Sequence, residues 1–96
     1  MVTREAVIEA LKTVEDPELF LDIWFLGLIY HIGVEETGHV NIEMTFTSPM
    51  CPAGPQLIGD VKQSVAALAG VTGVDVTVVF IPQWQPSDEV KQTLGI

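Results

Sequence analysis

The chain has 96 residues, of which 48% are hydrophobic, and its 13 acidic and 4 basic residues give a formal net charge of -9. This length supports one compact core, so we expect a single domain over residues 1–96. The charge excludes direct binding to nucleic acid or to an anionic membrane surface, because both require clustered Lys and Arg. One cysteine forms no internal disulfide, no apolar run approaches the ~20 residues of a membrane span, and the N-terminus lacks the pattern of a secretion signal. We therefore expect a cytoplasmic protein.

The N-terminal segment predicts a helix over residues 3–14. Val7, Leu11 and Val14 repeat at helical spacing, and Thr3 is a typical N-cap residue. Pro17 lacks an amide hydrogen and disfavours helical backbone in the residue before it, so the helix is expected to end at residues 15–17.

Two strands are predicted next, over residues 28–35 and 40–47, joined by a hairpin at residues 36–39. Gly38 suits the positive dihedral of a short hairpin turn. The second strand alternates strictly, with one side apolar (Val40, Ile42, Met44, Phe46) and the other polar (Asn41, Glu43, Thr45, Thr47). Such alternation indicates a sheet with one packed face and one face open to water or to a partner.

The second half predicts a helix, a strand and a short last helix. The helix begins at Gly54 and ends near Gly70, with apolar residues at helical intervals. The strand covers residues 74–81, and Ser87 can cap the last helix. The fold class is therefore α+β, a two-layer sandwich of order helix-strand-strand-helix-strand with a short C-terminal helix and a small mixed sheet. The helices are expected on the face bearing Val40, Ile42, Met44, Phe46, Val74, Val76, Val78 and Phe80.

Cys51 is the first candidate functional residue. It follows the second strand and precedes the second helix by a few residues. Free amides at a helix N-terminus stabilise a thiolate and lower its pKa, which favours a reactive or metal-binding sulfur. The alternative is an inert thiol packed under a loop, the commoner state of a lone cysteine. We expect Cys51 to be solvent-accessible and hardly needed for folding.

The acidic turn, Asp16, Pro17 and Glu18, is the second candidate. Two carboxylates held on a turn by proline can bind iron or act as acid and base. The alternative is an Asx turn that stops the first helix, with a solvated glutamate after it. His31 and His39 lack a partner at a familiar ligand spacing and are interpreted as ordinary polar positions.

Four motifs occur in the order of one known family: "VEDPEL", "LGLIY", "MTFTSPMCPAG" and "IPQWQPSDEVKQTLGI". The chain resembles the SufT- and PaaD-like iron-sulfur cluster assembly domain over nearly its whole length. The resemblance implies a factor that helps clusters reach recipient proteins. It also implies that Asp16, Glu18, Thr47 and Cys51 bind the cofactor, with Cys51, Asp16 and Glu18 as metal ligands.

The leading hypothesis is thus a non-enzymatic factor for iron-sulfur cluster assembly or delivery, which holds a transient iron or cluster and contacts assembly proteins or recipient apo-proteins. Because a cluster usually takes four protein ligands, a homodimer, glutathione or a partner's cysteines must complete the site. The alternative is an acidic adaptor for a metalloenzyme, with no metal of its own. A shared site requires the acidic turn to lie close to Cys51 and Thr47.

Overall fold

The structure is a computed structural model that describes residues 2–47 and 54–95. Its elements, in chain order, are α1 (Arg4–Leu11), α2 (Ile23–Leu26), β1 (Ile29–Val34), β2 (His39–Met44), α3 (Gly54–Ala66), β3 (Gly73–Val78) and α4 (Asp88–Leu94). No helix in the described ranges has both the length and the apolar character needed to cross a membrane.

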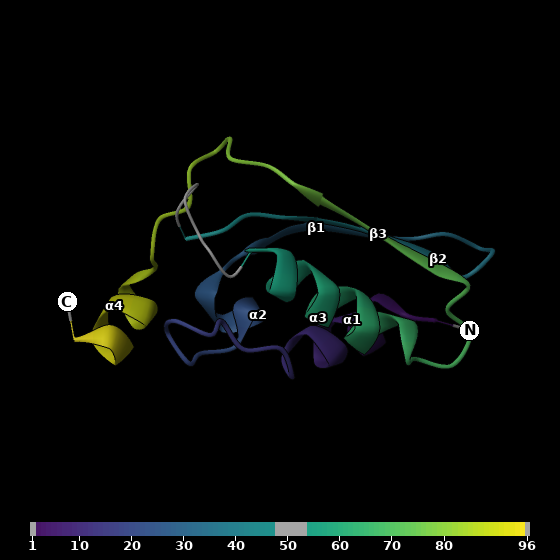
Figure 1. The fold of residues 1–96 in the computed structure, drawn as a ribbon, viewed down its shortest axis with the longest axis horizontal. Coiled ribbons are helices and arrows are strands. Elements are labelled where there is room, and N and C mark those ends of the chain that lie inside the picture. The colour runs from purple at the N-terminus through teal and green to yellow at the C-terminus, as the bar shows by residue number, and fades with distance from the viewer. Residues whose placement is uncertain (1, 48–53, 96) are drawn as a thin grey trace.

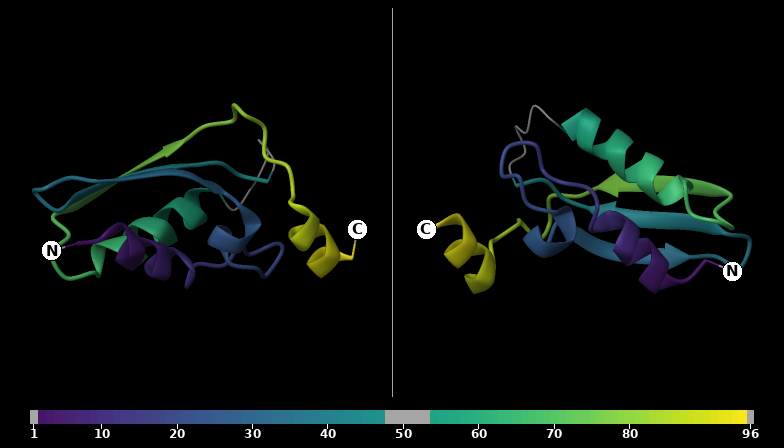
Figure 2. Two further views of the ribbon diagram at one scale, coloured as in Figure 1. Left: turned by 180° about the vertical axis from the view of Figure 1, so that it is seen from behind. Right: turned by 90° about the horizontal axis from the view of Figure 1, so that it is seen from below.

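The sheet is small and mixed, as predicted. Its strand order is β1-β2-β3, with β1 antiparallel to β2 and β2 parallel to β3. Helices α1 and α3 lie beside each other under one face, and within the described residues the other face carries no helix (Figures 1 and 2). The predicted two-layer α+β sandwich is confirmed.

The core fills the space between the sheet and the two long helices. Its fully buried side chains include Val7 and Leu11 of α1, Leu57, Val61 and Val65 of α3, and Val40, Ile42 and Met44 of β2. Each large apolar side chain buried in this way stabilises the fold by about 1.5–3 kcal/mol. The sheet face predicted from the alternation of β2 is therefore the packed one.

The first helix is shorter than predicted: α1 ends at Leu11 rather than Val14. The Thr13 hydroxyl donates to the Ala10 carbonyl at 2.6 Å, and the Thr13 amide donates to the same oxygen at 3.1 Å. Threonine thus satisfies the carbonyl that the next helical turn would have used. Thr3 does cap the helix, accepting from the Ala6 amide at 3.1 Å.

Helix α2 was not predicted, because a single turn leaves no apolar period in the sequence. Asp22 caps it by accepting from the Phe25 amide at 2.8 Å, and Gly27 ends it with φ +79°. Both are typical helix-boundary residues, so the "DIWFLG" stretch contained a signal in its caps.

Both long apolar alternations stop earlier than predicted. Strand β2 ends at Met44, and Thr45, expected on the open face, is only 1% exposed. Strand β3 ends at Val78, and Phe80, expected in the core, is 43% exposed. Once the ladder ends, the backbone turns and the two-residue period no longer decides which side chains are buried. The predicted environments of Thr45 and Phe80 were therefore wrong: Thr45 is buried and Phe80 is exposed.

The crossing segment, residues 79–87, runs from the end of β3 across the end of the sheet to α4, beyond α2 (Figures 1 and 2). The Tyr30 hydroxyl of β1 donates to the Pro82 carbonyl at 2.9 Å. The Trp84 indole Nε1 donates to the Leu26 carbonyl at 2.7 Å. Trp84 therefore satisfies a carbonyl at the C-terminal end of α2, where backbone acceptors lack helical partners.

Replacing Trp84 with phenylalanine is expected to lower the free energy of unfolding by about 1–2 kcal/mol, because it removes this donor and keeps an aromatic ring. Chemical denaturation measures the change. Trp24→Phe is the matched control, since the Trp24 indole donates no hydrogen bond within the described residues and is also half-buried. If both variants lost the same free energy of unfolding, the hydrogen bond from Trp84 to Leu26 would not be the source of the stability that Trp84 provides.

Candidate functional site

The acidic turn forms a closed loop after α1. The Asp16 amide donates to the Leu21 carbonyl at 2.9 Å, the Phe20 amide donates to the Asp16 carbonyl at 2.8 Å, and Glu15 bridges Asp22 in antiparallel fashion. Phe20 adopts φ +58°, a left-handed conformation that costs about 1–2 kcal/mol for a residue other than glycine. The hydrogen bonds across the loop offset that cost and fix the turn.

Asp16 is buried, with 1% of its surface exposed. Its Oδ1 accepts two backbone hydrogen bonds, from the Glu18 amide at 2.8 Å and the Leu19 amide at 3.1 Å. The Asx turn, one of the two interpretations of this motif, is therefore present. A role for Asp16 as a metal ligand rests on its other oxygen and stays a prediction. Glu18 is exposed on the same turn.

Two Asp16 variants distinguish the contribution of the Asx turn to stability from that of the negative charge. Asp16→Ala removes the acceptor of two amides and is expected to lower the free energy of unfolding by about 1–3 kcal/mol. Asp16→Asn keeps Oδ1 as an acceptor, so it should lower stability by less than about 1 kcal/mol. Thermal melting measures both. An asparagine variant as unstable as the alanine variant would show that the negative charge, rather than the Asx turn, holds this loop.

The acidic turn lies at the end of the sheet toward which β2 runs. This end is opposite the β1–β2 hairpin, and it also holds α2 and the crossing segment (Figures 1 and 2). Thr47, half-buried, follows β2 at this end. Asp16 and Thr47 thus occupy the same end, as a shared site requires. Cys51 lies outside the described residues, so its predicted accessibility and its proximity to the turn stay predictions.

The described ranges hold no group of three or more His, Cys, Asp and Glu side chains able to bind a metal ion. His39, for example, pairs with Asp75 at 2.7 Å between its Nε2 and the carboxylate Oδ2, which fits its interpretation as an ordinary polar position. Any iron ligand set that uses Asp16 and Glu18 therefore needs donors from Cys51 or from another molecule.

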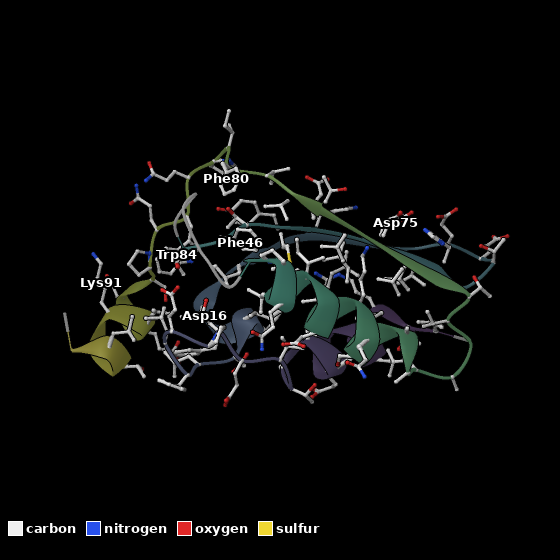
Figure 3. All side chains as sticks on the ribbon, viewed as in Figure 1. Asp16, Phe46, Asp75, Phe80, Trp84 and Lys91 are labelled. Atoms are coloured by element: carbon white, nitrogen blue, oxygen red, sulfur yellow. The ribbon has the colours of Figure 1, made fainter. Side chains whose placement is uncertain are left out.

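An aromatic cavity of about 270 Å³ opens at the same end of the sheet. We use this name for the space lined by Thr45, Phe46 and Thr47, which follow β2, and by Phe80, Gln83 and Trp84 of the crossing segment. Phe46 and Phe80 meet edge to face with ring centroids 6.1 Å apart. Figure 3 labels Phe46, Phe80 and Trp84 around this region, with Asp16 below them.

The chain is similar to proteins of one known family. The family model described as "Iron-sulfur cluster assembly protein" matches residues 4–78. The chain belongs to this family. It is 40% identical over 96 residues to a protein of Porphyromonas gingivalis named Fe-S protein maturation auxiliary factor, an alignment that covers 97% of this chain and 91% of the relative.

A second relative and a solved structure, both of similar size, support the same family. The chain is 42% identical over 84 residues to the Fe-S protein maturation auxiliary factor SufT of Staphylococcus aureus, covering 84% of this chain and 96% of that one. Its fold matches the crystal structure of a domain of unknown function, DUF59, from Bacillus anthracis with a TM-score of 0.88 and 36% identity, covering 96% of this chain and 91% of the other. The resemblance inferred from the four motifs is confirmed.

Sequence reasoning for this family member did not find the aromatic cavity. Its walls come from segments that are far apart in the chain, and Thr45 and Phe80 were assigned to the wrong environments. The sequence did contain one indication of it, because aromatic residues follow the ends of both strands. Phe46 comes after β2, and Phe80 and Trp84 come after β3. Large aromatics in irregular segments mark either local packing or a contact surface, and the sequence alone does not separate the two.

Proposed function

We propose that this chain is a non-enzymatic factor that assists iron-sulfur cluster assembly or delivers clusters to recipient proteins, with Cys51 as thiolate ligand or transfer group. The observation that carries the proposal is the family match over residues 4–78, joined to nearly end-to-end likeness with maturation auxiliary factors. The cluster is cargo in this account, and the reduced thiol suits a cytoplasmic location.

The chemistry needs more ligands than one thiolate. Clusters are usually held by four protein ligands, mostly cysteine thiolates, and this chain has one cysteine. Cys51 would therefore share the cluster with a second copy of the chain, with glutathione or with cysteines of a partner. The exposed carboxylate of Glu18, the second oxygen of Asp16 and the Thr47 hydroxyl are the oxygen groups that we assign to a transient iron site at this end of the sheet.

The partners of this role are the iron-sulfur assembly proteins that supply a cluster and the apo-proteins that accept it. Partner binding and cargo transfer would then occur at one place, since the missing ligands come from the partner itself. Release then follows when the recipient offers more thiolate ligands than this chain does.

An acidic adaptor without metal of its own is the alternative, and one observation favours it. One carboxylate oxygen of Asp16 is already occupied by two backbone amides. In that case the sheet face opposite the helices, which carries the His39–Asp75 pair and an Asn41–Glu35 hydrogen bond of 2.9 Å, would hold a metalloenzyme while another factor loads it.

A cellular test addresses the general role. Cells that lack the native copy are compared with cells in which this chain is restored, by assaying one iron-sulfur enzyme and one metal-free enzyme. We expect restoration to raise the activity of the iron-sulfur enzyme and to leave the metal-free enzyme unchanged. Equal effects on the two enzymes, or no effect on either, would contradict a role in iron-sulfur protein maturation.

A further inference from the structure

The aromatic cavity has walls of two kinds. Phe46, Phe80 and Trp84 supply aromatic rings, and the two phenylalanines meet edge to face. Thr45, Thr47 and Gln83 supply oxygen atoms. This combination suits a flat group that stacks on rings and donates hydrogen bonds.

Thr45 is the most informative polar group in the cavity. It is 1% exposed, yet the hydrogen bond that its Oγ1 makes within residues 2–47 and 54–95 is a long one, donated to the Phe46 carbonyl at 3.5 Å. That distance lies at the limit for a hydrogen bond between oxygen atoms. Because the Thr45 hydroxyl uses its hydrogen to donate to Phe46, its lone pairs are what it can offer to a ligand that donates.

The negative charge of the chain around the cavity favours a positively charged ligand. The chain carries a formal net charge of -9, and no Lys or Arg occurs in residues 39–47 or 73–87, which supply the cavity walls and the strands leading to them. Glu43 lies exposed on β2, and Asp88 begins α4 directly after the crossing segment. In Figure 3, Lys91 lies on the far side of Trp84 from Phe46.

We propose that the aromatic cavity binds the arginine side chain of a partner polypeptide. A guanidinium group is planar, stacks on aromatic faces and presents five donors, which complement the rings and oxygen acceptors of the cavity. A lysine ammonium is more strongly hydrated and does not stack, and an apolar side chain would leave Thr45 without a better partner. The negative field of the chain attracts the cation and weakens with added salt.

This inference adds a recognition element beside the proposed cluster site and does not depend on it. Thr47 lines the cavity and also belongs to the proposed site, so a partner anchored by arginine would lie next to the place of cluster transfer. The binding itself needs no iron, sulfide or client enzyme. Its failure would therefore leave the proposed maturation role standing.

The test uses the isotope-labelled full chain and three blocked tripeptides, in which glycine residues flank arginine, neutral citrulline or apolar norleucine. The two indole N–H signals of the chain, from Trp84 and Trp24, are followed by NMR. We expect the arginine peptide to shift the Trp84 signal and not that of Trp24. We also expect it to bind about tenfold tighter than citrulline, a difference within the range of a desolvated cation–π contact.

Two variants locate the binding. Phe80→Leu keeps an apolar side chain at a partly exposed position and removes the ring, so arginine affinity is expected to fall about tenfold. Ile81→Ala is the matched control, because Ile81 is 89% exposed and outside the cavity, and it should bind as wild type. Equal binding of citrulline and arginine, tighter binding of norleucine, or unchanged affinity in a folded Phe80→Leu variant would each overturn the proposal.

Discussion

Replacing Cys51 with alanine is expected to abolish support of iron-sulfur enzyme maturation in cells that lack the native copy. The same change is expected to alter the free energy of unfolding by less than about 0.5 kcal/mol, since an exposed loop side chain contributes little to stability. The reason is the sequence position of Cys51, between a strand and a helix and next to Pro52, where regular pairing is disfavoured. Thermal melting and enzyme assays measure the two effects separately.

Thiol labelling of the native protein supplies the control for this prediction. The Cys51 thiol should react at once under native conditions, and Cys51→Ser, which keeps the size of the side chain, should fail in maturation as Cys51→Ala does. A native thiol that resists labelling, or an alanine variant that melts much earlier and still supports maturation, would identify Cys51 as a packing residue. The maturation mechanism would then lose its central group.

Replacing Gly38 with alanine is expected to lower the free energy of unfolding by about 3 kcal/mol or more, because a left-handed conformation and a backbone clash act together. Gly38 has φ +92°, and an added Cβ would lie 2.1 Å from the Gly70 carbonyl oxygen. The Thr72 amide also donates to the Gly38 carbonyl at 3.0 Å, so the hairpin has little room to move away from the α3–β3 connection. The melting temperature should fall by at least about 12 °C.

Gly59→Ala is the matched control for Gly38→Ala. Gly59 lies exposed within α3, and an added Cβ meets nothing within 4 Å. Alanine there should raise the free energy of unfolding by about 0.5–1 kcal/mol, because glycine is a poor helix former. If both alanine variants had the same small effect, the hairpin would not be held against the 70–72 turn as described.

Much of the fold could be predicted from the sequence, because helical spacing and two-residue alternation report which face of an element is buried. The helical spacing of Leu57, Val61 and Val65 predicted which side of α3 is buried. The strict alternation of Val40, Ile42 and Met44 predicted which side of β2 packs against the helices. The hairpin at Gly38 was also predictable, since a positive φ favours glycine. These signals are local, so no knowledge of distant contacts was needed.

The candidate site was only partly predictable, because its parts come from distant segments. The acidic turn was found, but the two backbone hydrogen bonds to Asp16 Oδ1 depend on the exact turn geometry. Thr45 and Phe80 were misplaced because the alternation in their strands continues in the sequence beyond the point where pairing ends. The contact of the Trp84 indole with the Leu26 carbonyl joins residues far apart in the chain, and no local pattern indicates it.

Whether Cys51 binds the cluster is tested by anaerobic incubation of wild type and Cys51→Ala with iron and sulfide, followed by visible absorption and iron analysis. Wild type is expected to gain the absorption of an iron-sulfur cluster and bound iron, and the alanine variant is expected to gain neither. Asp16→Asn, which keeps the Asx turn, should retain the fold and bind less iron. Equal cluster absorption in wild type and Cys51→Ala, or none in wild type, would contradict the claim that Cys51 binds the cargo.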